Sequence, residues 1–95
     1  MVVYAVENHI RDSSGFYDVT LIGDYKLFSS FYAALEHART RAQNVARTEE
    51  AMGRQAHISE SNEVYARRII ITVDSEFEGR RDRIAEIHVV EVPVN

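Results

Sequence analysis

The chain has 95 residues, of which 45% are hydrophobic and 27% are charged, and it contains four glycines, one proline and no cysteine. This length predicts one domain spanning residues 1–95, and the lack of cysteine excludes a disulfide framework, a thiolate metal site and a cysteine nucleophile. The formal net charge of −4 makes binding to duplex DNA an unfavourable hypothesis. The first residues lack the features of a secretory signal, and no apolar run approaches the roughly 20 residues of a membrane span. We therefore expect a cytoplasmic protein without membrane contact.

The N-terminal quarter has the composition of a β-hairpin. Residues 2–10 are rich in Val, Tyr and Ile and predict a first strand. A polar cluster with Gly15 follows and is typical of a turn, and residues 16–25 predict a second strand.

The hydrophobic period then changes from that of a strand to that of a helix. Either Ser29 or Ser30 can cap a helix, because a serine hydroxyl accepts a bond from a free backbone N–H two or three residues on. The pattern continues to about Met52, where Gly53 is a suitable C-terminal stop. Apolar residues recur at spacings of three and four and predict one buried stripe: Phe31, Ala34, Leu35, Ala38, Ala42, Val45 and Ala46.

The C-terminal half predicts a second hairpin. Residues 54–62 have no clear period and are interpreted as a loop, whereas residues 64–73 are dense in β-branched and aromatic residues and predict a strand. A charged connection over residues 76–83 leads to a final strand at 84–92. The predicted fold is α+β: a single-layer antiparallel four-stranded sheet in ββαββ order, with one long helix packed on one face.

The predicted strands are apolar on both faces, although a single helix can cover only one of them. The last strand shows this pattern. Alternation along the strand places Ile84, Val90 and Val92 on one face and Ile87 and Val89 on the other. We therefore expect a homodimer or another homo-oligomer, formed sheet to sheet or edge to edge. The alternative is that β-bulges shift the parity or that long side chains shield the second face. The expected interface residues are Tyr4, Val6, Ile70, Val90 and Val92.

Arginine is the second candidate for function, since the chain has ten arginines and one lysine. Guanidinium groups bind phosphate in a bidentate manner, so clustered arginines predict an anion-binding site. The alternative is that these arginines form a solvated, charged turn. The two arginine runs are expected at opposite ends of the second hairpin and so in separate patches. The anion-binding candidates are Arg67, Arg68, Arg80, Arg81 and Arg83.

Catalysis and metal binding find little support in the sequence. The only close spacings of histidine with a carboxylate are His9 with Asp12 and His57 with Glu60, and two ligands do not make a metal site. No phosphate-binding glycine loop or dinucleotide motif is present. We therefore predict no catalytic residue, no metal ligand and no cofactor.

Three segments of the N-terminal half form a pattern that occurs in other small proteins: Val3-Tyr4-Ala5-Val6, Leu21-Ile22-Gly23-Asp24-Tyr25, and Ser29-Ser30 before an alanine-rich helix. About half of the chain thus resembles small uncharacterised strand-strand-helix-strand domains of bacteria and phages, which imply no catalytic residues. Small cysteine-free proteins of this kind are similar to phage-encoded inhibitors of bacterial defence, such as anti-CRISPR proteins. We therefore predict a non-catalytic binding protein that acts by protein–protein interaction through the outer sheet face and the arginine hairpin, in the host bacterial cytoplasm if phage-encoded. The alternatives are an oligomeric binder of an anionic nucleotide signal and a minor phage structural or assembly subunit.

Overall fold

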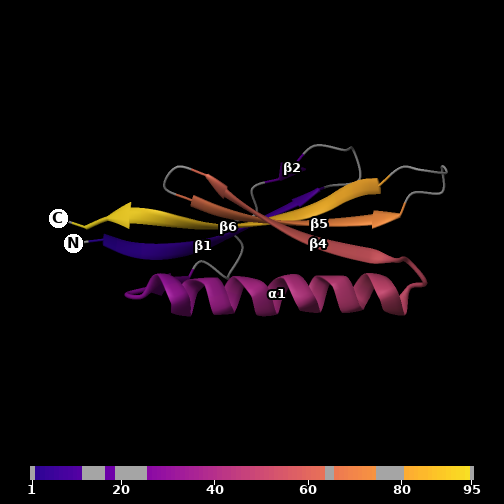
Figure 1. The fold of residues 1–95 in the computed structure, drawn as a ribbon, viewed down its shortest axis with the longest axis horizontal. Helices are drawn as coiled ribbons and strands as arrows, with labels where there is room; N and C mark the ends of the chain where they lie inside the picture. The colour runs from indigo at the N-terminus through magenta and orange to yellow at the C-terminus, as the bar shows by residue number, and fades with distance from the viewer. Residues whose placement is uncertain (1, 12–16, 19–25, 64–65, 75–80, 95) are drawn as a thin grey trace.

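The structure is a computed structural model that describes residues 2–11, 17–18, 26–63, 66–74 and 81–94. One long helix lies along one face of an antiparallel sheet, and both chain termini lie at the same end of the molecule (Figure 1). The α+β class and the position of the helix on one face of the sheet are confirmed. In the part of the chain that the structure describes, no helix is long and apolar enough to cross a membrane.

The described residues form six strands and one helix, so the prediction of a four-stranded ββαββ order was wrong. Three strands precede the helix and three follow it, and the sheet has the order β2-β1-β6-β5-β4, with β3 also paired to β1. The elements are β1 (Val2–Arg11), β2 (Tyr17–Asp18), β3 (Lys26–Phe28), α1 (Phe31–Ala51), β4 (Ala56–Glu63), β5 (Ala66–Asp74) and β6 (Arg81–Pro93).

The predicted N-terminal hairpin is confirmed where the structure describes it. β1 pairs with β2 in antiparallel register, with Ile10 opposite Asp18. The rest of the predicted second strand, residues 19–25, lies outside the described residues. The short strand β3, which pairs antiparallel with β1 through Leu27 opposite Ala5, was not predicted.

The predicted loop over residues 54–62 is instead the eight-residue strand β4. Its backbone pairs with β5 along its whole length, from Ala56 opposite Val73 to Glu63 opposite Ala66. β4 is an edge strand, so its side chains need not be apolar to be compatible with the sheet. Hydrophobic periodicity therefore gave no signal for it.

The two ends of α1 follow from local chemistry. Ser30 is the N-cap, and its hydroxyl accepts a hydrogen bond from the backbone N–H of Ala33. At the other end Gly53 has a φ of 86°, and the N–H groups of Gly53 and Arg54 donate to the carbonyls of Glu50 and Glu49. This pair of bonds is the Schellman arrangement, which requires a left-handed residue at the position of the glycine.

The core lies between α1 and the face of the sheet that we call the inner face. The predicted stripe of α1 supplies mainly alanines, which let the helix approach the sheet closely. The largest fully buried side chains are Ile69, Ile71, Ile87, Val6 and Val89, and the helix buries Ala34, Leu35, Ala38, Ala42 and Ala46 against the sheet.

A β-bulge in β6 changes which residues share a face of the strand, compared with the strict alternation expected from the sequence. Ile71 pairs with Ala85 but Thr72 pairs with Arg83, so Ile84 is an extra residue in β6. Ile84 packs against the core and does not share a face with Val90 and Val92 as predicted. The same bulge places Arg83 and Glu86, three residues apart, on one face of the strand.

Candidate functional site: a glutamate, histidine and arginine cluster

The side of the sheet that faces away from α1, here called the outer face, carries most of the titratable side chains of β1, β5 and β6. Among the described elements only α1 packs across the sheet, and it does so on the inner face. The centre of the outer face holds a group that we call the outer-face cluster: Glu7, His9, Arg68, Arg83, Glu86 and His88.

Two histidines meet at the centre of this cluster. β1 and β6 pair so that Glu7 lies opposite His88 and His9 lies opposite Glu86. The rings of His9 and His88 stack with their centroids 4.1 Å apart, and His9 Nε2 lies 3.4 Å from Glu7 Oε2. The four residues therefore alternate acid and imidazole at the corners of a square.

Glu86 lies between His88 and two arginines. Its Oε1 lies 3.3 Å from Arg68 Nη1 and 3.6 Å from Arg83 Nη1, although these arginines come from different strands. The Glu86 side chain is only 10% exposed. A buried carboxylate requires such partners, because an unpaired charge in this position would be strongly destabilising.

The environment of His88 favours its neutral form. Burial lowers the pKa of His88, and the nearby His9 lowers this pKa further, while Glu86 and Glu7 act in the opposite direction. His88 Nε2 is buried and has no hydrogen-bond partner among the described residues. Its distance to Glu86 Oε1, 3.9 Å, is too long for a hydrogen bond.

Three members of the cluster could hold a metal ion. One donor atom from each of Glu7, His9 and His88 lies within 4.8 Å of the other two. Two imidazoles and a carboxylate are a ligand set found in proteins for zinc and for other divalent transition metals. This group was not predicted, because spacing along the sequence pairs His9 with Asp12 and His57 with Glu60.

The observed histidine contacts differ from those suggested by spacing. His9 contacts Glu7, and His57 Nε2 lies 2.9 Å from Asp74 Oδ1 across the β4–β5 pair. One signal for the cluster was nevertheless present in the sequence. The tripeptide Glu-x-His occurs in both β1 and β6, and alternate residues of a strand share a face.

The arginine candidates are distributed over both faces of the sheet. Arg68 and Arg83 converge on Glu86, so the expectation of separate patches was wrong for these two residues. They meet because long side chains reach along the outer face from positions on either side of Glu86. Arg80 and the side chain of Arg81 lie outside the described part of the structure.

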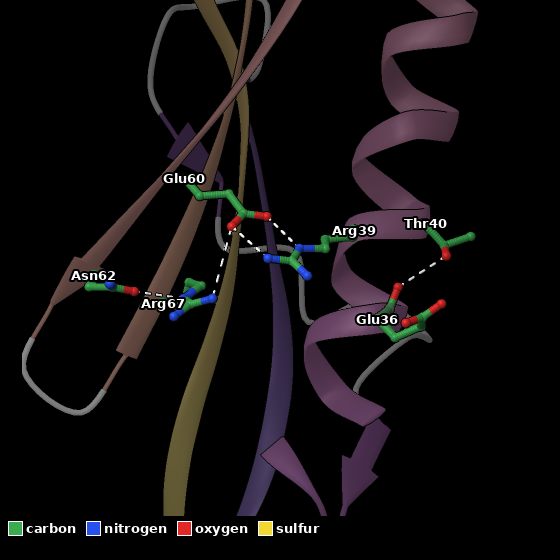
Figure 2. Close-up of polar contacts among 6 residues, drawn as sticks. All are labelled: Glu36, Arg39, Thr40, Glu60, Asn62 and Arg67. Carbon is green, nitrogen blue, oxygen red and sulfur yellow. Dashed lines mark hydrogen bonds and ion pairs between the residues drawn. The ribbon is translucent and has the colours of Figure 1, made fainter. Parts of the chain in front are cut away.

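Arg67 belongs to a different network on the inner face. Arg39 of α1 donates to both carboxylate oxygens of Glu60 on β4, at 2.6 and 3.0 Å, while Arg67 Nη1 lies 4.0 Å from Glu60 Oε2 (Figure 2). Arg67 also donates to Asn62 at 2.7 Å and lies over the ring of Phe31. The Arg39 guanidinium lowers the pKa of Glu60, and the network joins the helix to the edge strand.

A pocket also lies on the inner face. It has a volume of about 580 Å³ and includes no histidine among its described lining residues. It is therefore separate from the outer-face cluster. Its lining residues are Tyr4, Phe31, Asn62, Ala66, Arg67, Val89 and Glu91.

The predicted interface residues also divide between the two faces. Val6 is fully buried in the core, and Tyr4 packs edge-on against Phe31 with ring centroids 5.6 Å apart, so neither lies on the outer face as expected. Ile70, Val90 and Val92 do lie on the outer face, where each is half-buried. The middle of this face is polar, in contrast to the expected apolar surface.

No protein-family model, curated protein or solved structure matches this chain.

Proposed function

We propose that this chain is a non-catalytic binding protein that acts by protein–protein contact through the outer face of its sheet, and that the bound protein is a second copy of the chain. The observation that carries the proposal is the alternating square of Glu7, His88, His9 and Glu86. A two-fold rotation about an axis that lies in the plane of the interface and runs along or across the strands exchanges the glutamate corners of such a square with the histidine corners. Each glutamate of one copy then lies against a histidine of the other, so the pattern is complementary to itself.

The surroundings of the square support the same contact. One end of the outer face is apolar and half-buried and includes Val3, Val90 and Val92. An interface of this kind combines an apolar region with paired polar groups, and the apolar region supplies most of the gain from burial. Glu86 already pairs with Arg68 and Arg83, which favours a protein contact over an anionic nucleotide as the ligand.

The separation of the inner-face pocket from the outer-face cluster supports a non-catalytic role. An active site normally combines a concave pocket with groups of perturbed pKa. Here His88, whose pKa is lowered, lies on the outer face, and the pocket described above lies on the inner face.

The mass in solution tests the proposal, measured by sedimentation equilibrium over a wide range of protein concentration. We expect the unaltered chain to be a dimer and the Val92→Asp variant to be a monomer, because the new carboxylate would be buried in the interface. Val2→Asp is the matched control, since Val2 lies on the adjacent strand and points away from the outer face. Circular dichroism establishes that both variants are folded.

Three outcomes would overturn the proposed dimer. The first is an unaltered chain that stays monomeric at the highest concentration, and the second is a Val92→Asp variant that remains a dimer. The third is a Val2→Asp variant that dissociates to the same extent as Val92→Asp.

A further inference from the structure

The donor atoms of Glu7, His9 and His88 are arranged by the most regular part of the sheet. Glu7 and His9 alternate on one face of β1, and His88 lies directly opposite Glu7 on β6. All three belong to a continuous run of paired residues from Val2 to Ile10, so the backbone fixes their relative positions. A site built on paired strands is held more rigidly than one built on loops.

The spacing of these donors is close to that of a coordination sphere. In a tetrahedral site with ligand distances of about 2.0–2.2 Å, two ligand atoms lie about 3.4 Å apart. The distance from His9 Nε2 to Glu7 Oε2 is 3.4 Å, and the remaining separations are no longer than 4.8 Å. The rings of His9 and His88 stack with 28° between their planes, so binding requires both rings to turn until one nitrogen of each points at the same ion.

A second observation concerns the hydrogen bonding of His88. His88 Nε2 is buried and makes no hydrogen bond to any described residue, although a buried polar atom without a partner is costly. A metal ion bound at the cluster would give this imidazole a partner.

The charges around the donors are compatible with a cation. Arg68 and Arg83 oppose the approach of positive charge, but both pair with Glu86. Glu86 also lies 3.9 Å from His88 Nε2, so its carboxylate places a negative charge close to the donors. Glu7 adds a second carboxylate, which contributes directly to the ligand set.

We propose that Glu7, His9 and His88 bind one divalent first-row transition-metal ion, with Zn²⁺ as the probe. Imidazole nitrogen suits zinc, copper, nickel and iron, whereas Mg²⁺ and Ca²⁺ prefer sites made of oxygen alone. Three ligands leave at least one coordination position open toward the outer face, where water or a donor of a second copy completes the sphere. All three ligands come from one chain, so the metal site goes beyond the proposed dimer and does not depend on it.

The test is a titration of Zn²⁺ into the chelator-treated full chain, in competition with a chromogenic chelator. We expect one Zn²⁺ per chain and loss of more than about 100-fold in affinity for His9→Ala and for His88→Ala, since even outer-shell changes cost roughly 10–100-fold. Glu7→Gln removes the charge of a partly exposed ligand with little change in shape and is expected to weaken binding at least about tenfold. Substitution by Co²⁺ adds a visible absorption band that reports the coordination number.

His57→Ala is the matched control, because His57 lies on β4, contacts Asp74 and is not part of the cluster. Its affinity for Zn²⁺ should equal that of the unaltered chain. The proposal is overturned if binding does not saturate at one ion per chain, if Glu7→Gln binds as tightly as the unaltered chain, or if His57→Ala weakens binding as much as His9→Ala.

The mass of each sample, measured with and without Zn²⁺, separates this proposal from the proposed function. A monomer that binds one Zn²⁺ would contradict the proposed dimer and support the metal site. A dimer that binds no Zn²⁺ would support the proposed dimer and contradict the metal site.

Discussion

The rings of His9 and His88, which come from opposite ends of the chain, stack 4.1 Å apart on the outer face of the sheet. The antiparallel pairing of β1 with β6 causes this contact, because it places each histidine opposite the glutamate that neighbours the other. The first and last strands of the fold thus create the centre of the candidate site. Neither strand alone carries enough donors for a metal ion or the full alternating square.

The buried layer of the inner face should account for most of the stability of this small domain. Ile69 is fully buried, whereas Ile58 on the adjacent strand is 43% exposed. We expect Ile69→Ala to lower the free energy of unfolding by about 2–5 kcal/mol, because it leaves a cavity against α1. Ile58→Ala is the control and should cost clearly less. Urea denaturation measures both, and equal losses would contradict the assignment of the core.

The Arg39–Glu60 contact predicts a specific dependence of stability on pH. Arg39 lowers the pKa of Glu60 below its ordinary value of 4.5, so the folded state favours the ionised carboxylate. The contribution is therefore present above about pH 4.5 and is lost as the pH falls through the lower pKa of the folded state. We expect the unaltered chain to be slightly more stable than Glu60→Gln at pH 7, as is usual for exposed pairs, and this difference to vanish in acid.

Urea unfolding from pH 7 to pH 3 measures this difference. Glu50→Gln is the control, because Glu50 is an exposed helix carboxylate outside the network, and its difference from the unaltered chain should change less with pH. A difference between the unaltered chain and Glu60→Gln that stays constant over the whole range would argue against the network as a source of stability.

The C-terminal end of α1 depends on the backbone of Gly53. Its φ of 86° is strained for a residue with a side chain, although a Cβ atom there would meet no atom within 4 Å. Gly53→Ala should therefore lower the free energy of unfolding by about 1–2 kcal/mol through backbone strain alone. Gly53→Asn should cost less, because asparagine adopts this conformation more readily. Thermal unfolding compares the variants, and an alanine variant as stable as the unaltered chain would exclude the strain.

The sequence by itself determined the parts of the fold that depend on local chemistry. Hydrophobic spacing of three and four marked the buried stripe of α1, and serine and glycine marked its ends, because capping and left-handed backbone depend on neighbouring residues only. The strand β5 was predictable for a similar reason, since its run of isoleucines favours a buried strand. The edge strand β4 gave no such signal, because its place in the sheet depends on backbone pairing with β5 and not on its own apolar residues.

Only the tertiary structure decided the candidate site. The pairing register of β1 with β6 brought Glu7, His9 and His88 together, and the bulge at Ile84 turned Arg83 toward Glu86. Register assigned Tyr4 and Val6 to the inner face as well, against the expectation from composition. The physical reason is that a strand has a period of two residues, so a shift of one residue moves every side chain to the other face. Sequence spacing sets this alternation within one strand, but only the pairing of strands decides which residues meet.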